Sequence, residues 1–176
     1  AACPRSRAAP AGESAIRLRA RGTSSRFSDI FLGEVELPGP AATDDFVIRR
    51  RDGLHAYQLA VVIDDAFQGI THVVRGRDLL ESTPHQIFLR ARLGLAPVRY
   101  GHIPLLLNAQ GQKLSKQNHA PPLDDARAPH NLMLCLEALG QLPPPPALRN
   151  DCAAILAWAI AHWQRALVPA QDRVAL

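Results

Sequence analysis

The chain has 176 residues, and 47% of them are hydrophobic, which is enough for one domain with its own core or for one domain and a helical appendage. No apolar run approaches the length that crosses a membrane, which excludes a membrane-spanning helix in this sequence. The net charge of +4 and the pI near 9.4 are compatible with a polyanionic partner such as nucleic acid, although an arginine-rich composition produces the same values without one.

The cysteines bound the compartment and the metal chemistry. Cys3, Cys135 and Cys152 are widely spaced and odd in number, which is not a disulfide framework and favours a reducing cytoplasm. Cys135 and Cys152 fall on the apolar faces of expected helices, where buried thiols are predicted. Cys3 has no CxxC or CxC partner, and a single ligand does not hold zinc. The sequence also starts without a methionine, and we expect a fragment of a longer protein.

The first part of the chain predicts short β elements. Residues 17–21 alternate arginine with apolar residues, as in a strand with one charged face, and residues 27–37 alternate as in a hairpin. Residues 46–50 are typical of a strand that ends at the turn Arg51-Asp52-Gly53.

The middle of the chain alternates strands with helices. The expected elements are a helix over 57–67 that stops at Gly69, a strand over 70–74, a helix over 79–93 that ends at Gly94, and a short strand over 103–107. This alternation predicts an α/β fold with a parallel sheet.

The last part has a different character. Residues 118–130 are expected to form a loop, residues 131–139 an amphipathic helix, residues 143–146 a stiff polyproline spacer, and residues 151–167 a second helix. The apolar face of the second helix is predicted to consist of Ile155, Leu156, Ala159 and Trp163.

The lysines are unusual in number and position. Only two occur, Lys113 and Lys116, three residues apart in Lys113-Leu114-Ser115-Lys116-Gln117, whereas the other eighteen basic residues are arginines. An ammonium is a compact charge on a flexible stem, suited to a phosphate. We predict a mobile loop whose lysines close over a triphosphate and stabilise the leaving pyrophosphate, with Ser115 as a hydroxyl donor. The alternative is a solvated surface turn.

Arg75 and Tyr57 frame the central helix–strand unit. Arg75 follows an apolar strand, so its guanidinium should emerge at the carboxyl end, where it could grip a substrate carboxylate in a bidentate pair. Tyr57 offers a phenol at the start of the preceding helix. By spacing alone, the simpler interpretations are a surface ion pair of Arg75, for example with Asp78, and a packing role of Tyr57. For the adjacent Asp64-Asp65, capping or pairing with arginine is favoured over metal binding, and no general base is assigned.

The order of the motifs resembles a known family. The motifs that carry the resemblance are Asp45-Phe46-Val47-Ile48-Arg49-Arg50-Arg51-Asp52-Gly53, Tyr57-Gln58-Leu59-Ala60-Val61-Val62-Ile63-Asp64-Asp65, Gly69-Ile70-Thr71-His72-Val73-Val74-Arg75-Gly76, Thr83-Pro84-His85-Gln86-Ile87, His102-Ile103-Pro104-Leu105-Leu106-Leu107-Asn108 and Lys113-Leu114-Ser115-Lys116-Gln117. Together they look like the catalytic domain of glutamyl-tRNA synthetases, most strongly over residues 44–120, and the last matches the second signature loop of class I aminoacyl-tRNA synthetases.

The resemblance implies an α/β fold, the C-terminal half of a class I synthetase Rossmann-type nucleotide-binding domain with a small helical C-terminal tail. Residues 1–43 would be the end of a zinc region or inserted connecting segment. Residues 44–125 would be the second half of the catalytic domain, and residues 126–176 a helical tail without an anticodon-binding domain.

Within that superfamily the sequence is similar to the short paralogue, glutamyl-queuosine tRNA(Asp) synthetase. Gln117 stands where glutamyl-tRNA synthetases usually have arginine, and only about sixty residues follow the loop. The implied activity is ATP-dependent formation of glutamyl-adenylate without tRNA, followed by transfer of the glutamyl group to queuosine at the wobble position of tRNA(Asp). The implied partners are L-glutamate, ATP with Mg, and this tRNA. The protein is expected to be a monomer.

The resemblance also implies roles for individual residues. Tyr57 and Arg75 would bind glutamate, and Lys116 would contact ATP, with Lys113 and Ser115 in the same catalytic loop. Cys3 lies where the last zinc ligand of the family would fall, and the other ligands would lie upstream.

The first class I signature, resembling His-Ile-Gly-His, is absent from this sequence, so we expect the 176-residue fragment alone to be inactive in glutamate activation. The alternatives are a fragment of a translational glutamyl-tRNA synthetase and a non-catalytic tRNA-binding paralogue. The chance occurrence of Lys-Leu-Ser-Lys in an unrelated α/β binding protein is a more distant alternative.

Overall fold

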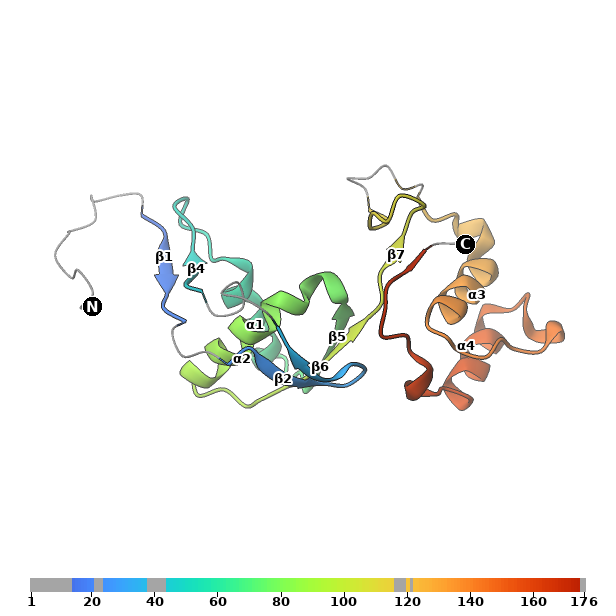
Figure 1. The fold of residues 1–176 in the computed structure, drawn as a ribbon. Helices are drawn as coiled ribbons and strands as arrows, with labels where there is room; N and C mark the ends of the chain where they lie inside the picture. The colour runs from blue at the N-terminus through green and yellow to red at the C-terminus, as the bar shows by residue number, and fades with distance from the viewer. Residues whose placement is uncertain (1–13, 21–23, 38–43, 116–119, 121, 175–176) are drawn as a thin grey trace. The chain divides into compact units, whose positions relative to one another are not determined.

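The computed structural model describes residues 14–20, 24–37, 44–115, 120 and 122–174 (Figure 1). The helices in these ranges are α1 (Tyr57–Phe67), α2 (Thr83–Arg92), α3 (Ala128–Ala138) and α4 (Cys152–Ala161). The strands are β1 (Ile16–Leu18), β2 (Arg26–Asp29), β3 (Gly33–Glu36), β4 (Phe46–Arg49), β5 (His72–Gly76), β6 (Arg99–Ile103), β7 (Leu106–Leu107) and β8 (Arg173–Val174).

The chain divides into two units. The first consists of residues 1–28, 34–73 and 81–100, and the second of residues 29–33, 74–80 and 101–176. Within the described ranges, no helix is both long and apolar enough to span a lipid bilayer.

The first unit has a small core between a two-stranded sheet and two helices. β1 pairs antiparallel with β4, and α1 packs against both β4 and α2 (Figure 1). Its buried members are Ala20, Phe46, Val62 and Leu89. Complete burial of an aliphatic side chain such as Val62 contributes about 1.5–3 kcal/mol to stability, so these four residues hold the unit together.

The helix ends in this unit follow the predicted glycines. Gly69 and Gly94 have φ values of +69° and +66°, and each lies just beyond its helix, where a residue without Cβ adopts the left-handed conformation at low cost. The predicted start of the second helix at Leu79 is wrong, because residues 77–82 form a 3-10 helix and α2 begins at Thr83. Pro84 lies in the first turn of α2, where its missing N–H costs nothing.

A four-stranded sheet has the order β3-β2-β6-β5. β2 and β3 are the arms of the hairpin predicted over residues 27–37, and β5 is the predicted strand, placed two residues later than expected. β4 does not belong to this sheet, because it pairs with β1. The predicted strand over 103–107 is split at Pro104, which has no N–H for a ladder, into the end of β6 and the short β7.

In the second unit, α3 and α4 pack against each other (Figure 1). α4 is capped by Asp151, whose carboxylate accepts hydrogen bonds from the backbone N–H groups of Ala153 and Ala154. The helix ends at Ala161, so the predicted helix over 151–167 is too long. Only Ile155 of the predicted apolar face is fully buried, whereas Leu156 and Trp163 are 49% and 42% exposed. Trp163 lies beyond the end of α4, and the buried stripe of the helix is narrower than its apolar period predicts.

The tail corrects a further prediction. Cys135 is exposed and Cys152 is half-buried, so neither is the predicted buried thiol. The predicted proline spacer is packed into the tail, because Pro144 is fully buried and its carbonyl accepts a hydrogen bond of 2.9 Å from Arg149 Nε. Pro145 has extended backbone dihedrals, and a 3-10 turn starts at Pro146.

Candidate functional site

Arg75 lies at the carboxyl end of β5, as the sequence predicts, and hydrogen bonds within the second unit hold its side chain. Its Nε donates to His102 Nε2 at 3.1 Å, and its Nη2 donates to the carbonyl of Leu79 at 3.2 Å. Bonds from two different nitrogens define the plane of a guanidinium. The plane of this group is therefore fixed by β6 and by the 3-10 turn that follows β5.

A buried carboxylate holds His102 in turn. The Asp29 and His102 side chains are both 0% exposed, and His102 Nδ1 lies 2.6 Å from Asp29 Oδ2. The other oxygen of Asp29 accepts backbone N–H groups from Phe31 at 2.9 Å, from Leu32 at 3.0 Å and from His102 itself at 3.2 Å. Because both oxygens are bonded, the buried charge of Asp29 is compensated.

The charge state of His102 follows from its two neighbours. Arginine only donates, so Nε2 of His102 accepts and carries no proton, and the proton lies on Nδ1, facing Asp29. Burial is the main cause that lowers the pKa of His102, the hydrogen bond and charge of Asp29 act in the opposite direction, and the charges of Arg75 and Arg77 lower it further. His102 is a neutral imidazole between a carboxylate and a guanidinium.

Lys113 lies near the same segment. Its ammonium forms an ion pair with Asp78, which is three residues beyond Arg75. The backbone of Lys113 pairs antiparallel with Leu107, and Leu114 N–H donates to the carbonyl of Leu106 at 2.8 Å. Lys113 therefore lies on the returning arm of a tight hairpin. Ser115 follows as a half-buried residue.

A C-terminal segment supports the strand that enters this hairpin. β8 pairs in parallel with β7, and the Asp172 carboxylate accepts the N–H of Leu105 at 2.9 Å. The same oxygen lies 3.4 Å from Arg77 Nη1, and Arg77 Nη2 donates to the Pro169 carbonyl at 3.4 Å. β7 is thus held on one side by β8 and on the other by the Lys113 hairpin.

Replacement of Asp172 by alanine should loosen β7. The substitution removes the acceptor of a part-buried backbone N–H and the partner of Arg77, a loss of about 1–3 kcal/mol. Hydrogen exchange of the amides of residues 105–107 in the complete protein should become about tenfold faster or more. Unchanged exchange there, with faster exchange confined to residues 165–174, would show that β7 does not depend on this contact.

Tyr57 is the first residue of α1 in the other unit, and it is 50% exposed. Asp64 and Asp65 also lie on α1, the first exposed and the second half-buried. Lys116 and Cys3 lie outside the described residues. Among the residues that the structure does describe, no group of three or more His, Cys, Asp or Glu side chains is arranged to hold a metal ion.

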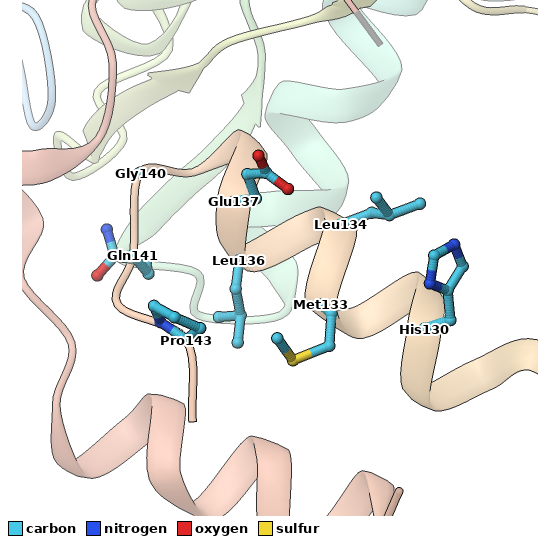
Figure 2. Close-up of a pocket in the computed structure, with 8 residues that line it drawn as sticks. All are labelled: His130, Met133, Leu134, Leu136, Glu137, Gly140, Gln141 and Pro143. Atoms are coloured by element: carbon cyan, nitrogen blue, oxygen red, sulfur yellow. The ribbon is translucent and has the colours of Figure 1, made fainter. Parts of the chain in front are cut away.

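A separate cavity of about 460 Å³ borders α3 and the turn after it (Figure 2). Figure 2 shows Met133 and Leu136 on the same side of α3, as the helical spacing of three requires. None of the described site residues Tyr57, Arg75, Lys113 and Ser115 lines this cavity. The candidate site is therefore the cluster around Arg75.

Sequence reasoning missed Asp29 and His102 as site residues. His102 stands in one of the motifs that carry the resemblance, which was the available signal, but no chemistry was assigned to it. Asp29 ends a hairpin strand 73 residues away from His102, and no local pattern connects the two.

Known proteins place the chain in a family. The sequence model described as tRNA synthetases class I (E and Q), catalytic domain, matches residues 4–127. The glutamyl-Q tRNA(Asp) synthetase of Pseudomonas fluorescens is 51% identical over 157 residues, which are 89% of this chain and 53% of the relative. That of Methylococcus capsulatus is 48% identical over 165 residues, which are 94% of this chain and 55% of the relative. The chain thus spans about half the length of the curated relatives it matches.

Solved structures agree on the fold. A glutamate tRNA ligase from Elizabethkingia meningosepticum, crystallised in complex with its amino acid, superposes with a TM-score of 0.63 at 24% identity, covering 86% of this chain and 34% of that chain. The glutamate-tRNA synthetase of Elizabethkingia anophelis gives a TM-score of 0.61 at 24% identity, covering 91% and 34%. The predicted α/β class I fold is confirmed, and the chain belongs to the family of class I (E and Q) tRNA synthetase catalytic domains.

Proposed function

We propose that the complete protein containing this chain activates glutamate with ATP and transfers the glutamyl group to queuosine at the wobble position of tRNA(Asp). The observation that carries the proposal is a cluster at the end of β5. Arg75 is fixed there by His102, and Asp78, three residues further along the chain, forms an ion pair with Lys113. The similarity to the glutamyl-Q tRNA(Asp) synthetases of Pseudomonas species supports the choice of amino acid and tRNA.

Arg75 and Tyr57 are the proposed glutamate-binding residues. A guanidinium with a fixed plane presents its charge and N–H donors to a carboxylate in a defined direction, and the phenol of Tyr57 supplies a neutral hydroxyl. Fixing the amino acid in this way places its reacting carboxylate before the reaction starts, which lowers the entropic cost of the step.

The chemical step would join the α-carboxylate of glutamate to the α-phosphorus of ATP. An oxygen–phosphorus bond forms to give glutamyl-adenylate, and the bond to the β-phosphate breaks and releases pyrophosphate. Negative charge grows on the leaving group, so ammonium groups at that position stabilise the transition state. Lys116 is the proposed ATP contact, with Lys113 and Ser115 in supporting positions.

Mg would accompany ATP as part of the substrate. Cys3 is the proposed zinc ligand of the complete protein. We also propose that the complete protein is a monomer and is located in the cytoplasm.

Replacement of Lys116 by alanine in the complete protein should slow adenylate formation. Loss of one charge-assisted contact to the leaving group costs about 2–4 kcal/mol of transition-state stabilisation, which corresponds to about 30- to 800-fold in rate. ATP–pyrophosphate exchange with glutamate measures this step. A rise in the glutamate KM with an unchanged rate at saturation would contradict the role.

The test of the function uses the complete protein, labelled glutamate, ATP and three separate pools, namely tRNA(Glu), tRNA(Asp) with queuosine and tRNA(Asp) without queuosine. Labelling of the queuosine-containing pool alone is the expected result. Labelling of tRNA(Glu) regardless of queuosine would make the protein a translational glutamyl-tRNA synthetase. A folded protein that binds tRNA but labels none of these pools would be a non-catalytic paralogue, and either result overturns the proposal.

A further inference from the structure

We propose that His102, oriented by Asp29, is a positioning residue that fixes the guanidinium of Arg75 for the substrate carboxylate. The inference rests on the proposed glutamate-binding role of Arg75. It adds two residues, from β2 and β6, to a site whose expected members are Tyr57, Arg75 and the lysine-containing hairpin.

The first step of the argument is the anchoring of Asp29. Three backbone N–H groups and one ring nitrogen surround its two oxygens at 2.6–3.2 Å, and its side chain is 0% exposed. Two of those N–H groups come from the turn between β2 and β3, so the carboxylate is part of the hairpin framework. The backbone N–H groups bind Oδ1 of Asp29, and its other oxygen, Oδ2, faces the imidazole of His102.

The second step is the tautomer. A carboxylate facing Nδ1 holds the proton on that nitrogen, and the N–H of Arg75 requires a lone pair on Nε2. Protonation of both nitrogens would set an N–H against the N–H of Arg75. Burial acts in the same direction, because it lowers the pKa of His102.

The third step excludes a direct chemical role. Both ring nitrogens of His102 are engaged at 2.6 Å and 3.1 Å, and the side chain is 0% exposed. A general base needs access to the proton that it removes. His102 therefore acts through Arg75. Nε2 of His102 accepts the Nε–H of Arg75, and the carbonyl of Leu79 accepts an N–H from Nη2 of the same arginine.

The test compares four variants of the complete protein in glutamate-dependent ATP–pyrophosphate exchange. Arg75→Ala establishes whether Arg75 serves glutamate at all. His102→Leu removes the acceptor, and Asp29→Asn presents an amide N–H₂ to the ring, which moves the proton to Nε2 and against Arg75. His102→Gln returns a carbonyl oxygen. The matched control is His85→Gln, because His85 is also a buried histidine but lies on α2 outside this cluster.

We expect His102→Leu and Asp29→Asn to raise the glutamate KM by about 10- to 100-fold, because a displaced binding group loses alignment with its substrate. The ATP KM should change by less than about twofold, His102→Gln should recover part of the loss, and His85→Gln should show no selective effect on glutamate. In the Arg75→Ala background, His102→Leu should add nothing, since the two residues act as one unit.

Three outcomes would overturn the inference. Suppose that Arg75→Ala raises the glutamate KM, but His102→Leu either leaves it unchanged or raises the glutamate and ATP KM values equally. Then His102 does not position Arg75, and the proposed function still stands. Additive effects of His102→Leu and Arg75→Ala have the same meaning. If Arg75→Ala leaves the glutamate KM unchanged, the glutamate role fails, and the inference falls with it.

A measurement without a variant covers the case in which substitutions prevent folding. ¹⁵N NMR of the wild-type complete protein should show His102 protonated at Nδ1 and unprotonated at Nε2 from about pH 6 to about pH 8, around the ordinary histidine pKa of about 6.5. A proton on Nε2 in this range contradicts the acceptor role.

Discussion

Replacement of Arg75 by alanine in the complete protein should raise the glutamate KM by about 30- to 800-fold, which corresponds to about 2–4 kcal/mol. The guanidinium is fixed by His102 and by the carbonyl of Leu79, so little conformational freedom is lost when it binds a carboxylate. The ATP KM should remain within about twofold. Initial rates of ATP–pyrophosphate exchange at varied glutamate and varied ATP measure the two values separately.

The control for this prediction is Arg26→Ala. Arg26 also forms an ion pair, at 2.9 Å with Glu36, but the two side chains are 72% and 60% exposed. Exposed pairs of this kind contribute about 0–1 kcal/mol, so both KM values should stay near those of the wild type. Equal increases of the glutamate and ATP KM values in Arg75→Ala would indicate general damage and would contradict a glutamate-binding role.

Replacement of Gly140 by alanine should destabilise the helical tail by about 3 kcal/mol. Gly140 follows α3 with φ +68°, and a Cβ there would lie 2.3 Å from the carbonyl oxygen of Leu167. That oxygen belongs to backbone, so the contact is relieved only by moving the segment after α4. Hydrogen exchange of α3 and α4 in the complete protein should become about 100-fold faster, since each tenfold corresponds to about 1.4 kcal/mol.

Gly94 provides the matched control for Gly140. It closes α2 with φ +66° and the same pair of backbone hydrogen bonds as Gly140, but a Cβ at Gly94 would meet nothing within 4 Å. Gly94→Ala should therefore cost only the conformational term, about 1 kcal/mol, and accelerate exchange in α2 by about fivefold. Equal effects of the two substitutions would show that the left-handed conformation, rather than the approach of Leu167, limits Gly140.

The apolar period of residues 57–67 specifies α1, and the glycines after α1 and α2 specify where those helices end, because side-chain spacing and the left-handed φ are properties of neighbouring residues. The place of Arg75 at the end of a strand is local in the same sense. The order of the motifs added the family, which the comparisons confirm.

The tertiary structure decided the rest, because contacts between distant segments have no period in the sequence. Asp29 and His102 meet across 73 residues, and Lys113 meets Asp78 across 35. Likewise, the helical period places Cys135 among apolar neighbours, but the structure leaves it exposed. A pattern of residues states which face of an element is apolar, and only the packing of another element on that face determines whether it is buried.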